Sequence, residues 1–210
     1  MITTVICFLA AYLFGSIPSA VWIGKGFYNI DVRQHGSGNA GATNTLRVLG
    51  KKAGFIVLGL DALKGYAAAS LAAFILPEIT DQNQLLIYKM LLGFVAVIGH
   101  VYPIFAGFKG GKGIATLLGI VIALNYWLAL GCFILFVAIV SLTRYISVGS
   151  MFSAAFSPLM ALFLNQNNIN PLFYFCCVVA VLVIYTHRSN IKRLANGTEN
   201  RFSFKKKTTT

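Results

Sequence analysis

The chain has 210 residues, of which 58% are hydrophobic and only 10% are charged, and its formal net charge is +12. This composition excludes an ordinary soluble protein and predicts an all-α integral membrane protein. The positive charges lie between apolar runs and in the tail, so they indicate membrane topology, and we expect no nucleic-acid partner. We expect a single membrane-embedded domain over residues 1–204 and a basic, disordered tail over residues 205–210.

Hydropathy predicts seven transmembrane helices joined by glycine-rich loops. A full crossing takes about 20 apolar residues, so the segment 114–140 is long for one helix and short for two. The count therefore depends on a turn at Asn125 and Tyr126. The predicted spans lie near Thr3–Ile23, Ala53–Leu76, Leu85–Phe105, Ile114–Leu124, Trp127–Leu142, Met151–Leu164 and Leu172–Tyr185.

An odd number of crossings places the basic loops and the basic tail on one side of the membrane. Cytoplasmic loops carry an excess of lysine and arginine, so we expect the N-terminus outside and the C-terminus, with these loops, in the cytoplasm. The residues concerned are Lys25, Arg33, Arg47, Lys51, Lys52, Lys109, Lys112, Arg144, Arg188, Lys192, Arg193, Arg201 and Lys205–Lys207.

The first loop, from His35 to Gly50, is the strongest candidate for an oxyanion site. Its glycines can turn successive N–H groups toward an anion, its short polar side chains add donors, and its arginine can form a bidentate pair with phosphate. A helix in the following run would point its positive end at the same anion. The candidate ligands are Gly36, Ser37, Gly38, Asn39, Gly41, Thr43, Asn44 and Arg47.

Two other interpretations of this loop stay open. Residues 36–41 fit the pattern G-x-G-x-x-G, but a polar segment precedes them where a dinucleotide-binding fold requires an apolar strand. The loop could also be a flexible glycine connection between two membrane helices. Its serine, arginine and asparagines favour binding.

The second span contains Asp61 and Lys64, which share one helix face and can pair. Charges inside a membrane are costly and face the bundle interior. We therefore expect either a structural ion pair, in which the two charges neutralise each other and steady the helix, or a pair that supports the binding site from inside the bundle. His100, near the end of the third span, is expected to be structural.

The third loop resembles a second phosphate cradle, because glycines alternate with lysines just before a predicted helix. It is not a Walker A loop, since the earlier glycine is missing and a glycine replaces the hydroxyl residue. A positive loop with a glycine turn is the alternative. The candidate ligands are Lys109, Gly110, Gly111, Lys112 and Gly113.

Two more polar segments lie on the same predicted face. The fifth loop supplies Ser147 and Ser150, and the start of the tail supplies His187 and Asn190, which would share one face of a helix. The cysteines make no C-x-x-C pair, and the loops hold too few acidic side chains for a magnesium site. We predict neither a metal nor a cofactor.

Cationic loops with glycines and hydroxyls at one membrane face indicate phosphorylated ligands beside an apolar partner. Acyl transfer from a lipid-like donor to a phosphorylated acceptor fits both. The H-x-x-x-x-D pair of acyl-thioester-dependent glycerolipid acyltransferases is missing after each histidine. A transporter of an organic phosphate, which should show repeat symmetry and polar residues near the midplane, and a non-catalytic lipid-binding protein are the alternatives.

Five segments in fixed order resemble the bacterial acyl-phosphate:glycerol-3-phosphate acyltransferases (PlsY). They are GSIPSA (15–20), GSGNAGATNTLRVLG (36–50), GHVYPIFAGFKGGKGIAT (99–116), RYISVGS (144–150) and HRSNIKRLANGTE (187–199); Val148 and Ala195 stand where leucine is commoner. The resemblance implies seven spans in the bacterial inner membrane and cytoplasmic motif loops. It also implies acyl phosphate as donor and glycerol 3-phosphate as acceptor. We expect a monomer.

The expected catalytic set is Ser37, Arg47, Lys112, His187 and Asn190. By resemblance, the first two match essential positions of the first motif, and His187 and Asn190 match functional positions of the last. The glycines of the third loop match positions linked to glycerol-phosphate binding. Glu199 matches a position linked to structural integrity.

An acyl phosphate is a mixed anhydride that carries its own leaving group. The enzyme therefore has mainly to orient the two substrates and to neutralise the charge of their phosphates. We expect the glycerol 1-hydroxyl to attack the acyl carbon directly while a substrate phosphate oxygen takes the proton. In the first loop, Ser37, Thr43 and the glycine N–H groups would hold one phosphate. The other would be held by Lys112, Ser150 and His187, and Arg47 could bridge the two phosphates. The competing mechanism makes His187 the general base. Both require the polar segments to converge.

Overall fold

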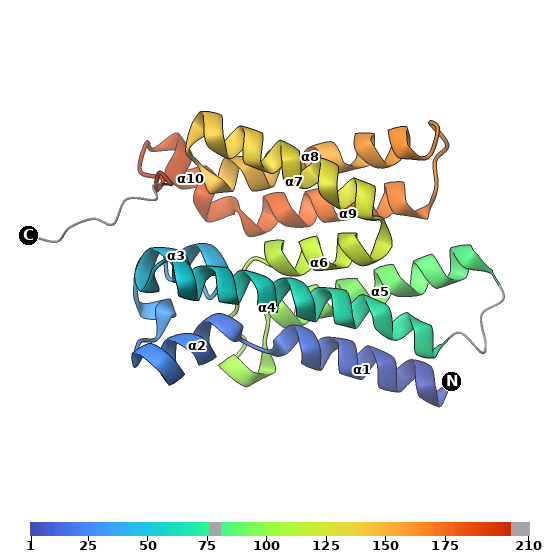
Figure 1. The fold of residues 1–210 in the computed structure, drawn as a ribbon, viewed down its shortest axis with the longest axis horizontal. Helices are drawn as coiled ribbons and strands as arrows, with labels where there is room; N and C mark the ends of the chain where they lie inside the picture. Colours follow the sequence, from blue (N-terminus) through green and yellow to red (C-terminus); the bar gives the residue numbers. More distant parts are fainter. Residues whose placement is uncertain (76–80, 203–210) are drawn as a thin grey trace, which may run out of the picture. The chain divides into compact units, whose positions relative to one another are not determined.

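The structure is a computed structural model that describes residues 1–75 and 81–202 (Figure 1). Its regular elements in these ranges are all helices, which confirms the all-α prediction. The chain divides into two compact units, Met1–Tyr126 and Trp127–Thr210. The single domain over residues 1–204 stays a prediction, and the predicted tail over residues 205–210 lies outside the described residues.

The first unit packs long helices against one another in pairs (Figure 1). α1 packs along α5, and α4 packs along α6 and α3. Its helices are α1 (Ile2–Ser16), α2 (Ser19–Tyr28), α3 (Ala42–Leu49), α4 (Lys51–Ser70), α5 (Gln82–Val101) and α6 (Ile114–Leu124), with the short 3-10 turns η1 (Val32–Gln34), η2 (Leu71–Phe74) and η4 (Ile104–Ala106).

The first predicted span is broken rather than continuous. α1 ends at Ser16, α2 begins at Ser19, and the two axes bend by 43°. Pro18 explains the break: it has no N–H to donate, and its ring disfavours helical geometry at the residue before it. Ile17 accordingly has an extended backbone, which leaves its carbonyl free of the helical ladder.

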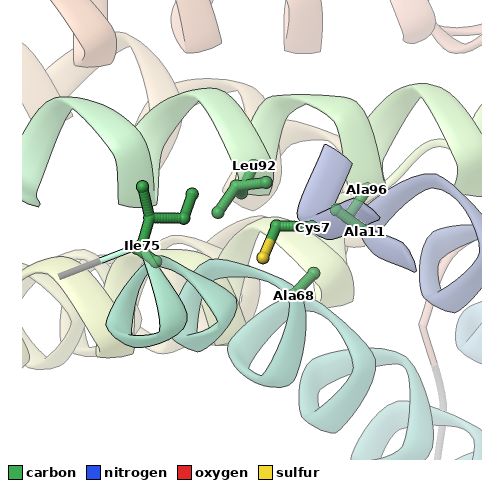
Figure 2. Close-up of a cluster of buried hydrophobic side chains, with 7 residues drawn as sticks. Cys7, Ala11, Ala68, Ile75, Leu92 and Ala96 are labelled. Atoms are coloured by element: carbon green, nitrogen blue, oxygen red, sulfur yellow. The ribbon is translucent and has the colours of Figure 1, made fainter. Parts of the chain in front are cut away.

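Small side chains let the helices of the first unit approach closely. Figure 2 shows a buried cluster in which α1, α4 and α5 meet. Between α4 and α6, a Cβ on Gly65 or Gly119 would collide with the backbone of the facing helix. Close backbone approach at glycine and alanine is the usual packing mode of membrane helices. The cluster consists of Cys7, Ala11, Ala68, Ala72, Ile75, Leu92 and Ala96.

Four helical stretches in the described residues are long and apolar enough to cross a membrane, or six if each of two bent pairs counts as one span. α6 is shorter: at about 1.5 Å per residue it covers roughly 17 Å of a ~30 Å hydrocarbon core. The break on which the count of seven depends is confirmed at Asn125, where α6 has ended at Leu124; Tyr126, predicted as part of the turn, is already the first residue of α7. Seven full crossings stay a prediction.

The second unit contains, in its described residues, α7 (Tyr126–Thr143) apart from its first residue, α8 (Ile146–Leu164), α9 (Pro171–Thr186) and α10 (Arg188–Ala195). α8 packs along α9. Asn170 caps α9 by accepting the backbone N–H of Phe173 at 3.1 Å, with proline at the first helical position. α9 and α10 bend by 57° at His187, so the predicted tail helix exists but turns away from the span before it.

Candidate active site

The first loop folds around the side chain of Asn44, which is 1% exposed. Its amide nitrogen donates to the carbonyls of Val32 at 2.7 Å and His35 at 3.0 Å. Its amide oxygen accepts the backbone N–H of Ser37 at 2.8 Å and the hydroxyl at 3.1 Å. Because an asparagine side chain has two donor protons and two lone pairs, these bonds use its full capacity. Asn44 therefore shapes the loop.

Two glycines make this turn possible. Gly36 and Gly38 have φ values of 63° and 72°, in the left-handed region that other residues rarely adopt. A Cβ on Gly36 would also collide with the amide oxygen of Asn44. The turn leaves Ser37 exposed at its tip.

α3 follows the loop and begins after Gly41, as the sequence predicted for a helix with its positive end at the loop. Thr43 and Arg47, four residues apart, share an exposed face of α3. Asn39 is partly buried. The donors expected from this segment thus come from both the loop tip and the exposed side of α3.

Arg33, in η1 just before the first loop, is hydrogen-bonded to η4, which precedes the lysines of the third loop; sequence reasoning missed this role. Its Nε and Nη2 donate to the two carboxylate oxygens of Asp31 at 3.0 and 2.8 Å, and its Nη1 donates to the carbonyl of Ala106 at 2.9 Å. These hydrogen bonds hold the pKa of Asp31 well below its ordinary value of 3.8, against the opposing effect of burial. The D-x-R spacing was the available signal, because an aspartate often accepts the N–H two residues on.

The third loop folds back on the end of α5. The backbone N–H groups of Gly110 and Gly111 donate to the carbonyls of Val101 and His100, each at 3.2 Å. A Cβ on Gly111 would collide with Nε2 of His100 and would stand 3.0 Å from the carbonyl oxygen of Ala40. Since Ala40 belongs to the first loop, the two predicted phosphate cradles meet at Gly111.

On either side of this contact the third loop carries its other predicted ligands. Lys109 is exposed and Lys112 is half-buried, while Gly113 is buried with a φ of 80° and precedes the first residue of α6. The left-handed turn at Gly113 lets the loop enter α6 directly.

A buried polar network lies beneath this contact. Nζ of Lys64 is 2.9 Å from Oδ1 of Asp61 and donates to the carbonyl of Ile17 at 2.7 Å. The same carboxylate oxygen is 3.8 Å from Nδ1 of His100, which lies 3.2 Å from the hydroxyl of Thr116. The predicted pairing of Asp61 with Lys64 is confirmed. The carbonyl at the α1–α2 break accepts one of the ammonium protons.

The second unit holds a separate polar cluster around Glu199. Its Oε1 accepts the hydroxyl of Ser147 at 2.8 Å and the amide of Asn190 at 2.7 Å, and its Oε2 accepts Nε of Arg193 at 2.7 Å. Burial raises the pKa of Glu199, but these hydrogen bonds outweigh it and lower the pKa below the ordinary value of 4.5. One carboxylate thus ties the start of α8 to α10.

Beside this cluster, His187 stands at the bend between α9 and α10 and is 3% exposed. Its Nδ1 lies 2.8 Å from the carbonyl of Val183. Because a carbonyl can only accept, Nδ1 carries the proton and Nε2 is the basic nitrogen of the neutral ring. Ser150 is buried and donates to the carbonyl of Ile146 at 3.0 Å.

The structure therefore groups the predicted site residues into two sets, one in each unit. The first and third loops come together in the first unit, and Ser147, Asn190 and Glu199 come together in the second. Within the described ranges, no group of three or more His, Cys, Asp or Glu side chains could hold a metal ion. The first set carries the hydroxyls and cations that suit phosphate, whereas the donors of Ser147 and Asn190 in the second set bond to Glu199.

This fold and these donor sets define a class: a helical membrane protein whose glycine-rich loops suit phosphate-bearing ligands. A family model described as glycerol-3-phosphate acyltransferase matches residues 5–197. Glycerol-3-phosphate acyltransferase 2 of Bacillus cereus (strain ATCC 10987 / NRS 248) is 44% identical over 208 residues, 99% of each chain. Glycerol-3-phosphate acyltransferase of Fusobacterium nucleatum is 41% identical, over 94% of this chain and 98% of the relative.

Solved structures agree. The crystal structure of PlsY, an integral membrane glycerol 3-phosphate acyltransferase, in its glycerol 3-phosphate form matches with a TM-score of 0.84 and 39% identity, over 95% of this chain and 96% of that chain. The lysophosphatidic acid form of PlsY matches with a TM-score of 0.80 and 37% identity, over 96% of each chain. The present chain belongs to the glycerol-3-phosphate acyltransferase family and is an integral membrane protein.

Proposed function

We propose that this protein transfers an acyl group from an acyl phosphate to the 1-hydroxyl of glycerol 3-phosphate, giving lysophosphatidic acid and phosphate, the first step of phospholipid synthesis. The observation that carries the proposal is the full-length match to glycerol-3-phosphate acyltransferases. The contact between the two glycine loops at Gly111 supports it, because it brings together two segments that carry cations and hydroxyls suited to phosphate.

We assign the third loop, Gly110 to Gly113 with its lysines, to the phosphate of glycerol 3-phosphate. Ser37 and Thr43 hold the phosphate of the donor. Arg47 bridges the two phosphates and so neutralises charge that develops on the leaving phosphate. Donors aimed at developing charge commonly supply the largest part of a rate enhancement. We keep His187 and Asn190 as proposed catalytic residues and Ser147 and Ser150 as proposed substrate-binding residues. Within the second unit, Glu199 accepts hydrogen bonds from Ser147 and Asn190.

The reaction then needs no covalent enzyme intermediate. The hydroxyl oxygen of the acceptor forms the new ester bond to the acyl carbon, the bond from that carbon to the phosphate oxygen breaks, and phosphate leaves with the electron pair. A substrate phosphate oxygen takes the hydroxyl proton. The residues supply orientation and charge neutralisation, which suffices for a donor as activated as a mixed anhydride.

The topology we propose follows the positive-inside rule. The chain crosses the inner membrane seven times, with its N-terminus outside and the two donor sets facing the cytoplasm, and it acts as a monomer. This arrangement gives the soluble acceptor access from the cytoplasm and the acyl chain access from the bilayer.

The test is an assay of the purified protein with glycerol 3-phosphate and either palmitoyl phosphate or palmitoyl-CoA. We expect lysophosphatidic acid and phosphate with palmitoyl phosphate and no product with the thioester. Arg47→Ala should lower turnover at least about a hundredfold. Lys192→Ala, which removes an exposed cation of α10, should leave turnover near that of the wild type. Product from the thioester alone would refute the donor, and release of no lysophosphatidic acid from either donor would favour an organic phosphate transporter.

A further inference from the structure

The buried ring of His100 lies where the two glycine loops meet. Its backbone carbonyl accepts the N–H of Gly111, and its Nε2 is so close to the Cα of that glycine that any side chain there would collide with the ring. The carbonyl oxygen of Ala40, from the first loop, borders the same space. His100 thus contacts the third loop directly and lies beside the first, although it belongs to neither.

The ring is held from its other side by groups inside the helix bundle. Nδ1 lies 3.2 Å from the hydroxyl of Thr116, which is 0% exposed, and 3.8 Å from Oδ1 of Asp61. Lys64 fixes that carboxylate through an ion pair and is itself fixed by the carbonyl of Ile17. Three helices, α4, α5 and α6, therefore determine where the imidazole stands.

We propose that His100 is a positioning residue for the phosphate-binding loops: its ring, fixed by Thr116 and the Asp61–Lys64 pair, sets the position of the Gly111 backbone and so the affinity for glycerol 3-phosphate. The inference rests on the proposed function, because it assigns that substrate to the third loop. This role would also explain why the Asp61–Lys64 pair is buried in a membrane helix, where charged side chains are costly.

If His100 only stabilises the core of the helix bundle, its replacement should have a different outcome. Its loss would reduce the amount of folded protein, so that turnover per milligram falls while the KM of each substrate stays unchanged. Displacement of the loop instead changes the KM for the substrate that the loop binds. The two roles are therefore separated by the individual kinetic constants.

The first experiment compares His100→Asn with His100→Gln. Asparagine keeps a polar group near Thr116 but leaves space beneath Gly111, whereas glutamine reaches toward the position of Nε2. We expect His100→Asn to raise the KM for glycerol 3-phosphate about tenfold, with kcat and the KM for palmitoyl phosphate within about threefold of wild type. His100→Gln should restore most of the affinity. Unchanged KM values in folded His100→Asn would overturn the proposal.

The matched control is Lys89→Met, a polar-to-apolar change on the same helix. Lys89 donates to the carbonyl of Ala123 at 3.4 Å, and it lies eleven residues before His100, about 17 Å along α5. Its KM for glycerol 3-phosphate should equal that of the wild type. An equal rise in this control would mean that any polar loss in α5 perturbs binding, which also overturns the proposal.

The second experiment is a double-mutant cycle that stays informative if His100→Asn folds poorly. Gly111→Ala should lower kcat/KM at least about a hundredfold, because the new methyl collides with the ring. Adding His100→Ala removes that collision, so the double variant should be at least about tenfold more active than the product of the single effects. If the effects of the two single substitutions on kcat/KM simply multiply in the double variant, the ring of His100 does not determine the position of the third loop.

Failure of the proposed function is distinguishable from failure of this inference. If wild-type protein makes no lysophosphatidic acid from palmitoyl phosphate, the proposed function fails before any variant is compared. If the wild type is active but the KM pattern and the cycle show no coupling between positions 100 and 111, only the positioning role fails.

Discussion

At the residue scale, the hydrogen bond from His187 to the carbonyl of Val183 fixes which nitrogen could exchange a proton with substrate. With Nδ1 protonated, only Nε2 could act as a base. Glutamine cannot accept a proton near neutral pH, so His187→Gln separates the two mechanisms. If a substrate phosphate takes the proton, the variant should keep more than about a thousandth of wild-type kcat, since a general base contributes up to about ten-thousandfold.

The measurement is kcat against pH for both proteins. Under our proposal the profile of His187→Gln keeps the rising limb of the wild type, because that limb belongs to a substrate phosphate whose second pKa is about 6. Loss of the limb together with a rate below a thousandth of normal would instead identify His187 as an indispensable base.

At the residue scale, the site assignments made from the sequence stay predictions, and the structure gives one of the predicted ligands a different task. Ser37, Asn44 and Arg47 were all assigned to substrate from the residue types of the first loop, and Ser37 and Arg47 also from the family resemblance. The hydrogen bonds of Asn44 to Val32, His35 and Ser37 are internal to the loop. A sequence cannot distinguish an amide that faces a ligand from one that closes its own turn, because both occur among glycines and short polar residues.

At the element scale, Glu199 joins α8 to α10 with a carboxylate whose side chain is 7% exposed. Replacing it with glutamine removes the ion pair to Arg193 and points an amide at a donor. We expect Glu199→Gln to cost about 1 to 2 kcal/mol of stability, at the lower end for charged hydrogen bonds because Arg193 is partly exposed. Lys192→Gln, on an exposed face of α10, should cost nothing measurable.

The pH dependence of this difference follows from the lowered pKa of Glu199. A carboxyl whose pKa is depressed by folding stabilises the native state above its unfolded pKa and loses that contribution as pH falls through its folded pKa. Thermal unfolding in detergent should therefore show a constant gap between wild type and Glu199→Gln from pH 6 to 8, and a shrinking gap below pH 4.5. A gap that widens in acid would contradict this assignment.

At the scale of the whole molecule, the sequence predicted the helical class, the break at Asn125 and the Asp61–Lys64 pair, all of which depend on local patterns. It missed the break at Pro18, because averaged hydropathy hides a single proline within an apolar run. It could not predict that Gly111 meets Ala40, since that contact depends on how α1, α4 and α5 pack. Tertiary contacts between loops distant in the chain have no signature in either loop alone.

The number of crossings decides the topology of the whole chain, and it can be measured. In a variant lacking Cys7, Cys132, Cys176 and Cys177, single cysteines replace one exposed residue at a time: Ile2, Asn167 in the turn before α9, and Thr198 after α10. Seven crossings place the first two outside and the third inside. A membrane-impermeant maleimide should then label Ile2→Cys and Asn167→Cys in right-side-out vesicles, and Thr198→Cys only after permeabilisation.

The alternative makes a distinct prediction. If α6 and α7 together cross the membrane only once, the chain has six crossings. Ile2→Cys and Thr198→Cys would then lie on the same side. Six crossings would also divide the basic loops between the two faces, so that the cationic donors of the first and third loops would no longer share a face with Arg193 and Arg201. The labelling pattern of two positions near the chain ends therefore tests at once the count of spans and the proposal that every donor set works in the cytoplasm.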